Sequence, residues 1–570
     1  SSVTMRSRRS AALYERDQMS LDQTVEISYP DGSVRELPKG TSLAEALAAG
    51  GYAGAGIVAG MANNLVRSLS SPVWVRSTVK PISLESEEGQ RVYRRSLCFI
   101  LAVCVSRTFP DRRLVIGHSL GNSYFYQFRD RETSEEELER IGAELGKLVA
   151  EDRPIERDLV SYMDALSYFE ERGMSESARL LEGRNDAEIH VYRCADRMDI
   201  SHGPLVDRTS RLAYYRLESF RHGFLLLFPH RSDPTSVPRE RRSSMLFGIY
   251  NEYKQWGRIL NVASVGRLNQ RVERGEITEF IRVNEALQNK RIAEIADSAV
   301  AAAGKGLILI AGPSSSGKTT FTKKLSIQLT VLGREPVVIS VDDYFLPREQ
   351  TPLDEDGNYD FESIHALDID LLNQDVSNLL AGKEVELPSF NFREGVREYK
   401  SGRIHLPDRG ILLMEGIHNL NDELTKEIPR QEKFKIYVSA LTQLNLDEHN
   451  RIATTDNRLI RRLVRDHQFR GLSAKQTLEM WPSVRRGEDR NIFPYQDTAD
   501  TAFNSALDYE LGILKNYAIP LLLQIKPYHE VYHEAARLMA FLNFFTTIPE
   551  KHVPSDSILR EFIGDSGFHY

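Results

Sequence analysis

The chain has 570 residues, of which 41% are hydrophobic and 27% are charged, as in ordinary globular proteins of about three or four domains. Its net charge of −8 excludes a chain that is basic throughout, the signature of many nucleic-acid-binding proteins. Three scattered cysteines exclude a disulfide framework and a thiolate metal site, which predicts a reducing, cytoplasmic environment.

Neither a targeting segment nor a membrane span is expected. Residues 1–23 are polar and charged and lack the apolar core of a signal peptide, so we expect a flexible segment. The longest apolar run, 97–105, is too short to span a bilayer and predicts a buried helix.

The first predicted domain covers residues 24–83. Apolar and polar residues alternate in 25–29 and 34–37, with Pro-Asp-Gly-Ser between them, which predicts a β-hairpin. Thr41 or Ser42 is expected to cap the helix that follows. This opening resembles the TGS module, a small ubiquitin-like α+β domain found in threonyl-tRNA synthetases and some GTPases.

The second predicted domain, residues 84–275, contains the apolar helix. It resembles the second N-terminal α+β domain of threonyl-tRNA synthetase, which edits mischarged tRNA in that enzyme. Arg95 and Phe99 stand where that family has two histidines, and Ser-His-Gly-Pro-Leu around His202 replaces a Cys/His-bearing motif. We therefore expect no editing chemistry, and we expect His118 and His202 to be hydrogen-bonded structural residues.

Two segments connect this region to the last domain. Residues 231–244, rich in proline, arginine and serine, predict an exposed linker. A long helix is predicted at 276–303, directly before a third domain at 304–570.

The most specific motif is Gly-Pro-Ser-Ser-Ser-Gly-Lys-Thr-Thr, which fits the phosphate-binding P-loop pattern G-x-x-x-x-G-K-[S/T]. An apolar strand is expected before it, at 306–311, and an amphipathic helix after it, at 321–329. Backbone N–H groups of such a loop and helix bind polyphosphate. Lys318 is expected to reach the terminal phosphates and Thr319 to ligate Mg²⁺. The candidate nucleotide-binding residues are Gly312, Pro313, Ser314, Ser315, Ser316, Gly317, Lys318, Thr319 and Thr320.

Strands and helices alternate after the P-loop. Apolar runs predict further strands at 337–341, 411–414, 434–438 and 520–525. Such strands, separated by helices, are typical of an α/β fold, a parallel sheet with helices on both faces. Ligands bind such a sheet at the carboxyl ends of its strands.

Acidic residues follow two of these strands. Asp342 and Asp343 end the second strand, and Glu415 ends the third. A carboxylate at this edge can accept the proton of an attacking hydroxyl group. Another can hold Mg²⁺, directly or through water.

An arginine-rich helix is predicted at 456–466. Four arginines recur at spacings that place them largely on one helix face, and a fifth follows: Arg458, Arg461, Arg462, Arg465 and Arg470. In a phosphoryl-transfer enzyme such a helix can close over the nucleotide and stabilise transition-state charge. The alternatives are a solvated basic face or a nucleic-acid contact.

Together these motifs, from about Gly306 to Leu523, resemble the uridine kinase/phosphoribulokinase family of P-loop kinases. Besides the P-loop and the arginine helix, the resemblance rests on the stretches 340–345, 359–368, 382–392 and 414–417. It implies that ATP and Mg²⁺ are the cofactors and that the acceptor is the hydroxyl group of a small molecule.

The resemblance also implies roles for individual residues. Asp342 would be the general base, while Thr319 and Glu415 would hold Mg²⁺, with Asp342 as a further metal candidate. Lys318, Arg465 and Arg470 would stabilise the phosphates. The acceptor would contact residues from the list Asp360, Phe390, Asn391 and Arg462.

The acceptor pocket departs from the uridine kinases. Phe390, Asn391 and Gly395 stand where that family has a tyrosine, an aspartate and a histidine, and Leu472 and Met480 replace an arginine and a glutamine. Since a buried polar group without its partner costs about 1–3 kcal/mol, these changes leave open whether the acceptor is a uridine- or cytidine-like nucleoside or a related ribose-containing molecule.

Three hypotheses follow. The chain is a kinase for a nucleoside or a related ribose-containing molecule, a kinase for a sugar phosphate, or a non-enzymatic ATP-responsive module. In each case the N-terminal domains could bind RNA or a protein, or support a homo-oligomer. The domain order resembles a bacterial group of nucleoside-kinase-like proteins, and the C-terminal segment 557–564 is expected to pack back on the fold.

Overall fold

The computed structural model describes residues 23–54, 56–238, 244–302, 306–354, 357, 359–391, 394–399 and 402–569. Nearly all of the predicted flexible segment 1–23 and part of the predicted linker 231–244 lie outside these ranges. The chain divides into two compact units. Unit 1 takes its residues from 1–167, 186–240 and 526–537, and unit 2 takes its residues from 168–185, 241–525 and 538–570. The three predicted domain boundaries stay a prediction.

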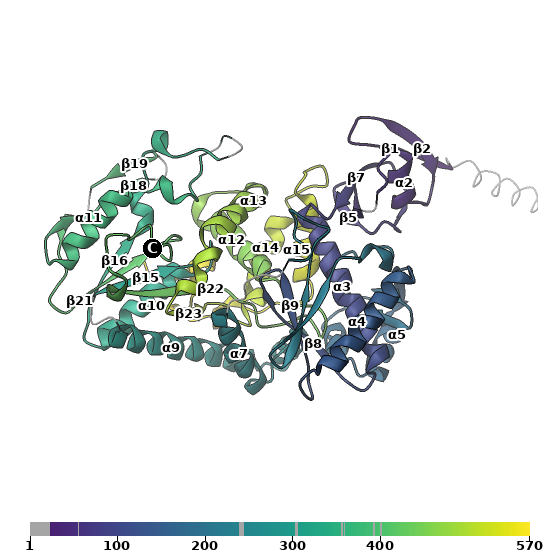
Figure 1. Cartoon of the computed structure of the whole chain (residues 1–570), viewed down its shortest axis with the longest axis horizontal. Helices are drawn as coiled ribbons and strands as arrows, with labels where there is room; N and C mark the ends of the chain where they lie inside the picture. Colours follow the sequence, from purple (N-terminus) through teal and green to yellow (C-terminus); the bar gives the residue numbers. More distant parts are fainter. Residues whose placement is uncertain are drawn as a thin grey trace, which may run out of the picture. The chain divides into compact units, whose positions relative to one another are not determined.

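Unit 1 begins with a mixed sheet in the order β2-β1-β7-β4-β5 (Figure 1). Its strands, and the small pair β3–β6, are β1 Thr24–Ser28, β2 Val34–Pro38, β3 Thr41–Ser42, β4 Ile57–Ala62, β5 Leu65–Arg67, β6 Pro72–Val73 and β7 Ser77–Ser83. β1 and β2 are antiparallel, so the predicted hairpin is confirmed. Ser42 caps helix α2 (Leu43–Ala49): its hydroxyl accepts the Glu45 N–H at 3.2 Å, and the Glu45 carboxylate accepts the Ser42 N–H at 3.0 Å.

The rest of unit 1 packs around the buried helix α3 (Glu87–Thr108), which contains the predicted apolar helix. A four-stranded sheet has the order β13-β14-β9-β8, and a three-stranded sheet has the order β10-β11-β12. The elements are β8 Leu114–Leu120, β9 Ser123–Phe128, α4 Glu135–Ala150, β10 Glu156–Ser161, β11 Glu188–Cys194, β12 Arg197–Asp199, β13 Arg216–Phe220 and β14 Gly223–Leu227, and helix α5, Tyr162–Glu171, has residues in both units. The α+β character expected for this part of the chain is confirmed.

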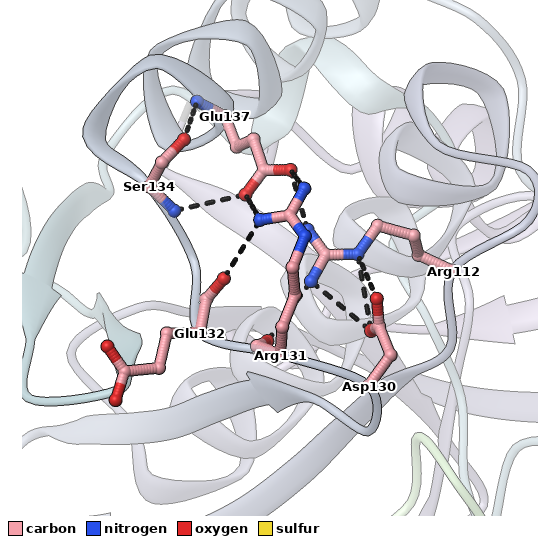
Figure 2. A network of polar contacts seen from close by, with 6 residues as sticks. All are labelled: Arg112, Asp130, Arg131, Glu132, Ser134 and Glu137. Carbon is pink, nitrogen blue, oxygen red and sulfur yellow. Dashed lines mark hydrogen bonds and ion pairs between the residues drawn. The ribbon is translucent and has the colours of Figure 1, made fainter.

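A charged network fixes the start of α4 (Figure 2). The Glu137 carboxylate accepts hydrogen bonds from the Ser134 backbone at 3.0 Å and from the guanidinium groups of Arg112 at 2.6 Å and Arg131 at 2.5 Å. Arg112 also pairs with Asp130 at 3.0 Å. Burial alone would raise the pKa of Glu137, but these hydrogen bonds lower it to about 2. The network joins α4 to the loop before it.

Unit 2 is built on a parallel sheet in the order β16-β21-β15-β22-β23. Its strands are β15 Leu307–Ala311, β16 Glu335–Ser340, β21 Gly410–Glu415, β22 Lys433–Ser439 and β23 Thr501–Asn504. Helix α10 (Lys318–Val331) covers one face, where Phe321 stacks on Phe503 with 4.7 Å between ring centroids. Helix α11 (Ile369–Leu380) packs on the other face, against Leu307 and Leu309 (Figure 1). The predicted α/β fold is confirmed.

The predicted strand at 520–525 is wrong. Residues 520–522 of this run form the end of helix α14 (Glu510–Leu522), residues 523–525 are not in a strand, and the last strand of the sheet is instead β23. A short apolar run does not distinguish a buried strand from a buried helix. β23 has four residues, Thr501–Asn504, of which only the two central ones are apolar, so it shows no apolar run.

Unit 2 has further elements, which include α6 Ser175–Glu182, α7 Ser244–Ile259, α8 Val265–Glu273, α9 Ile277–Ala302, β17 Val385–Glu386, β18 Ser389–Asn391, β19 Val396–Glu398, β20 Arg403–Ile404, α12 Thr454–Arg470, α13 Ala474–Asn491 and α16 Arg560–Ile563. Helix α15, Tyr532–Leu542, has residues in both units. α9 and α12 confirm the long helix and the arginine helix. In the described part of the chain, no helix is both long and apolar enough to cross a membrane.

Candidate active site

A cleft of about 1520 Å³ opens at the carboxyl edge of the parallel sheet in unit 2. Glu415, the last residue of β21, is in register with Ile310 of β15 and Ser340 of β16, so three strand ends meet there. The predicted site residues that line the cleft are Ser314, Ser315, Ser316, Gly317, Lys318, Thr319, Asp342, Asp360, Phe390, Glu415, Arg462, Arg465 and Arg470. The tertiary structure therefore brings most of the predicted site together.

The backbone of the P-loop accounts for its glycines. Ser315 and Gly317 have positive φ angles of 58° and 79°. A Cβ on Gly317 would lie 2.6 Å from Cγ2 of Ile558, and a Cβ on Gly312 would lie 2.1 Å from the carbonyl oxygen of Val438. Both positions therefore require glycine because neighbouring atoms approach too closely for a side chain.

Two arginines of α12 lie beneath the P-loop. Arg458 and Arg461 are 1% and 0% exposed. Arg458 Nε donates to the carbonyl of Ser314 at 2.9 Å, and an Arg461 guanidinium nitrogen donates to that of Ser315 at 3.3 Å. The expectation that these arginines form an exposed face or a lid is wrong for Arg458 and Arg461, which support the loop from inside the fold.

Carboxylates from two later helices neutralise these arginines. Arg458 pairs with Glu488 of α13, and Arg461 pairs with Glu510 of α14 at 2.5 Å. Glu488 also accepts the N–H of Ser314 at 3.0 Å. Buried charges need such partners, and helix spacing alone does not reveal them.

The other three arginines line the cleft around Asp466. Their distances to this carboxylate are 3.1 Å for Arg462, 3.5 Å for Arg465 and 3.4 Å for Arg470. Arg462 also donates to the Ser314 hydroxyl at 2.8 Å. Burial, with the nearby charge of Arg470, lowers the pKa of Arg465 to about 10, so this arginine stays protonated at neutral pH. A cluster of positive charge therefore faces the P-loop.

Lys318 is turned onto its own loop. Its Nζ donates to the carbonyl oxygens of Gly312 at 2.9 Å and Pro313 at 3.2 Å. Burial lowers the pKa of Lys318, while the carboxylates of Glu415 and Asp342 oppose this change. The ammonium group thus lies in the cleft with two acidic neighbours.

Thr319 and Glu415 form an oxygen-rich pair. The Thr319 hydroxyl lies 3.3 Å from both carboxylate oxygens of Glu415. Burial raises the pKa of Glu415 to about 7, although Lys318 opposes this rise. Oxygen ligands suit Mg²⁺, which usually takes one or two protein ligands and completes its shell with phosphate and water. No group of three or more histidine, cysteine, aspartate or glutamate side chains suited to a metal occurs in the described residues.

The two neighbouring aspartates have different surroundings. Asp342 lines the cleft, and burial raises its pKa against the positive charges of Lys318, Arg470 and Arg465. Asp343 accepts the backbone N–H of Phe390 at 3.1 Å. Asp342 is therefore placed to meet a ligand, while Asp343 holds the strand β18.

Aromatic rings line the side of the cleft next to Asp343. Phe345 lies with its ring centroid 5.7 Å from Phe390 and 6.0 Å from Phe361, and all three line the cleft. Asn391 does not line it; its side-chain amide donates to Glu398 at 3.2 Å within the β18–β19 hairpin. The contact predicted for Asn391 stays a prediction, although the cleft lining does not include it.

Gly395 replaces a side chain for a structural reason. Its φ angle is 70°, and a Cβ there would lie 3.0 Å from Cβ and Nε of Arg348. Arg348 lines the cleft beside it. An arginine from a different loop thus occupies the space next to this glycine.

Among the described residues, four carboxylates that were not predicted as site residues line the cleft: Asp354, Glu362, Glu479 and Glu561. Glu362 lies against Gly487 of α13, where a Cβ would come within 2.5 Å of its side chain, and Asn491 donates to its backbone oxygen at 2.7 Å. Glu561 comes from the C-terminal helix α16. Glu362 belongs to the stretch 359–368 on which the family resemblance rests, and Glu561 belongs to the C-terminal segment 557–564, but only the tertiary structure shows that both side chains line the cleft.

One region of the chain matches a family model. Residues 307–511 match the model described as the phosphoribulokinase/uridine kinase family. This match supports the coarser expectation of a P-loop kinase that acts on a small molecule.

The N-terminal part is similar to curated threonine–tRNA ligases. The chain is 34% identical to that of Symbiobacterium thermophilum over 203 residues, which are 35% of this chain and 31% of the relative. It is 32% identical to that of Acetivibrio thermocellus over 200 residues, which are 34% of this chain and 31% of the relative. The chain thus spans about a third of the length of the curated relatives that it matches.

Solved kinase structures also resemble part of the chain. A possible uridine kinase from Bacillus stearothermophilus is 18% identical, with a TM-score of 0.27, and covers 38% of this chain and 98% of its own. A D-glycerate 3-kinase from Cryptococcus neoformans is 14% identical, with a TM-score of 0.23, and covers 46% of this chain and 89% of its own. TM-scores this low support no conclusion about function. Residues 307–511 thus match the phosphoribulokinase/uridine kinase family model, and the N-terminal part of the chain is similar to threonine–tRNA ligases.

Proposed function

We propose that unit 2 transfers the γ-phosphoryl group of Mg-ATP to a hydroxyl group of a nucleoside or a related ribose-containing molecule. The observation that carries this proposal is the meeting of Lys318, Thr319, Asp342 and Glu415 in one cleft at the carboxyl edge of the sheet. Phosphoryl transfer needs a side chain that binds the phosphates, ligands for a metal ion and a general base. The family match of residues 307–511 agrees with this chemistry.

In this proposal the residues have distinct tasks. The P-loop N–H groups and Lys318 bind the β- and γ-phosphates, so the Lys318 ammonium group leaves the loop carbonyls that it contacts at 2.9 and 3.2 Å. Arg465 and Arg470 take up charge that develops on the transferred group. Asp342 accepts the proton of the attacking hydroxyl, a contribution of about 10²–10⁴ in rate.

Thr319 and Glu415 would hold the magnesium ion. When bound, Mg²⁺ neutralises negative charge on the phosphate oxygens. The ionised form of Glu415 is required for this task. A nearby cation favours that form, so binding of the metal lowers the raised pKa of Glu415.

The aromatic side of the cleft favours a flat acceptor group. Phe345, Phe361 and Phe390 offer ring surface on which a nucleobase can lie. Asp360 and Glu362 supply carboxylates that can accept hydrogen bonds from ribose hydroxyl groups. The second candidate acceptor is a sugar phosphate, which is favoured by the Arg348 side chain beside Gly395.

A screen with labelled ATP tests the function. Nucleosides and pentose phosphates are incubated with the full chain and with Lys318→Ala as the matched inactive control. We expect label transfer to a nucleoside that disappears in the control. Transfer only to pentose phosphates would establish the second candidate, whereas no transfer to any acceptor would favour an ATP-responsive module without catalysis.

The N-terminal part has a separate proposed role. Its similarity to threonine–tRNA ligases supports binding of an RNA or protein partner by the TGS-like and synthetase-like segments. Gel-shift titration of the full chain with tRNA tests the RNA partner. A shift at about micromolar protein or below that weakens with salt would support it, and no shift would oppose it.

A further inference from the structure

The C-terminal helix places a carboxylate on the P-loop helix. Oε2 of Glu561 accepts the backbone N–H of Thr320 at 3.1 Å and the Thr320 hydroxyl at 2.7 Å. Thr320 is the third residue of α10, directly after the lysine and threonine of the P-loop. A carboxylate from the C-terminal part of the sequence of unit 2 therefore accepts hydrogen bonds from two donors of the phosphate-binding motif.

The segment that carries Glu561 is built firmly into unit 2. Ile558 packs against Gly317 of the P-loop. The Cζ atom of Arg461 lies 4.9 Å from the centroid of the Phe562 ring. Lys324 of α10 pairs with Asp556 at 3.0 Å. This confirms the expectation that 557–564 packs back on the fold. The backbone of the segment is anchored, so the Glu561 side chain is the part that can move.

The two Thr320 donors suit a nucleotide phosphate. N–H groups in the first turn of a helix have no partner within the helix and favour anions. In a P-loop the backbone N–H groups bind the α- and β-phosphates, while the lysine reaches the β- and γ-phosphates. The Glu561 carboxylate offers the same chemistry, an anionic oxygen that accepts from both donors.

A carboxylate and a phosphate do not share these donors. Two anions at hydrogen-bond distance from one N–H group would lie close together in a partly buried site, where their repulsion is strong. Glu561 also lines the cleft, and its charge acts on Lys318, Glu415 and Arg465. The negative charge of Glu561 thus contributes to the electrostatic potential of the proposed nucleotide site.

We propose that Glu561 is a built-in competitor for the nucleotide: its carboxylate caps α10 in the nucleotide-free site, and a nucleotide phosphate displaces it. The inference rests on the proposed ATP site and adds its regulation by the C-terminal segment. Displacement turns one side chain and leaves α16 in place. Nucleotide affinity is therefore lower than the P-loop alone would give.

Isothermal titration of the full chain with ATP, ADP and adenosine tests this competition. Glu561→Gln keeps the side-chain shape and removes the charge, so we expect ATP and ADP to bind about two- to thirtyfold more tightly. Adenosine, which has no phosphate, should bind equally to both proteins. Asp565→Asn is the matched control, because Asp565 is an exposed carboxylate directly after this segment and does not line the cleft.

The outcomes separate the two proposals. Equal or weaker ATP binding by Glu561→Gln would overturn the competition and leave ATP binding by the wild type intact. If neither protein binds ATP, the proposed function fails together with the inference. Glu561→Ala guards against a residual hydrogen bond from glutamine, and a thermal melt of each variant checks that α10 stays folded without its cap.

Discussion

Arg458 and Glu488 form an ion pair inside unit 2, and the same Glu488 carboxylate accepts the N–H of Ser314 at 3.0 Å. Arg485 binds Glu488 as well, at 2.9 Å. The P-loop is thus held by a charged group that does not line the cleft. The geometry of the phosphate site depends on this interior contact.

Neutralising this carboxylate should destabilise the protein. Glu488→Gln leaves the buried Arg458 without its charge partner, so we expect a loss of about 3–5 kcal/mol in the free energy of unfolding. Urea titration of the full chain measures it. Glu335→Gln, which removes an exposed pair with Arg409 at 3.9 Å, should cost less than about 1 kcal/mol. Similar losses in both variants would contradict the structural role of Glu488.

The neighbouring aspartates should differ in function. Asp342→Asn removes the proposed base, so we expect turnover to fall by about 10²–10⁴ while ATP still binds. Asp343→Asn keeps an oxygen that can accept the Phe390 N–H, so its turnover should stay within about tenfold of the wild type. Label transfer to the acceptor found in the screen measures turnover, and calorimetry measures ATP binding. The assignment fails if Asp343→Asn is the more damaging change.

The Thr319 hydroxyl should determine how tightly the metal binds. Thr319→Ala removes one of the two proposed Mg²⁺ ligands, so the Mg²⁺ concentration for half-maximal ATP binding should rise by at least about tenfold. Thr319→Ser keeps the hydroxyl and should behave like the wild type. Titrating Mg²⁺ at fixed ATP measures this shift. An unchanged midpoint in Thr319→Ala would remove the hydroxyl from the metal site.

Glu362 should make stability depend on pH. Burial raises the pKa of Glu362 from 4.5 to about 7, and Glu488 adds to the rise while Arg462 opposes it. The folded state therefore binds a proton that the unfolded state has lost between these two values, so stability falls as pH increases from about 4.5 to about 7. Glu362→Gln removes this loss.

Thermal unfolding of the full chain at pH 5 and pH 8 measures the effect. The melting temperature of Glu362→Gln relative to the wild type should increase from the lower to the higher pH. Asp370→Asn is the control, since the Asp370 side chain is 91% exposed and should give a small difference at both pH values. If the difference in melting temperature between Glu362→Gln and the wild type is the same at pH 5 and pH 8, the pKa of Glu362 is not raised in the folded state and the prediction is wrong.

Much of unit 2 could be predicted because its signals are local. The P-loop needs consecutive residues, and Gly312 and Gly317 have no side chain because neighbouring atoms approach within 2.1 and 2.6 Å of a Cβ. Four strands contain apolar runs, whereas β23 has only two apolar residues between a threonine and an asparagine. The mistaken strand at 520–525 shares its apolar pattern with a buried helix.

The roles of the arginines needed the tertiary structure. Helical spacing predicts related faces for the four arginines Arg458, Arg461, Arg462 and Arg465. Two of them are buried because they pair with carboxylates from α13 and α14, whereas the other two face the cleft. Spacing within one helix carries no information about such partners.

The sequence by itself determined the phosphate-binding loop, the acids at two strand ends and the parallel sheet, because each depends on neighbouring residues or on a repeating pattern. Only the tertiary structure decided that Glu561 sits on Thr320, that Glu362 enters the cleft and that Glu488 holds the P-loop from inside. These contacts join residues that are far apart in the chain. Their energy comes from charge and burial in the folded state, so no local pattern of residues encodes them.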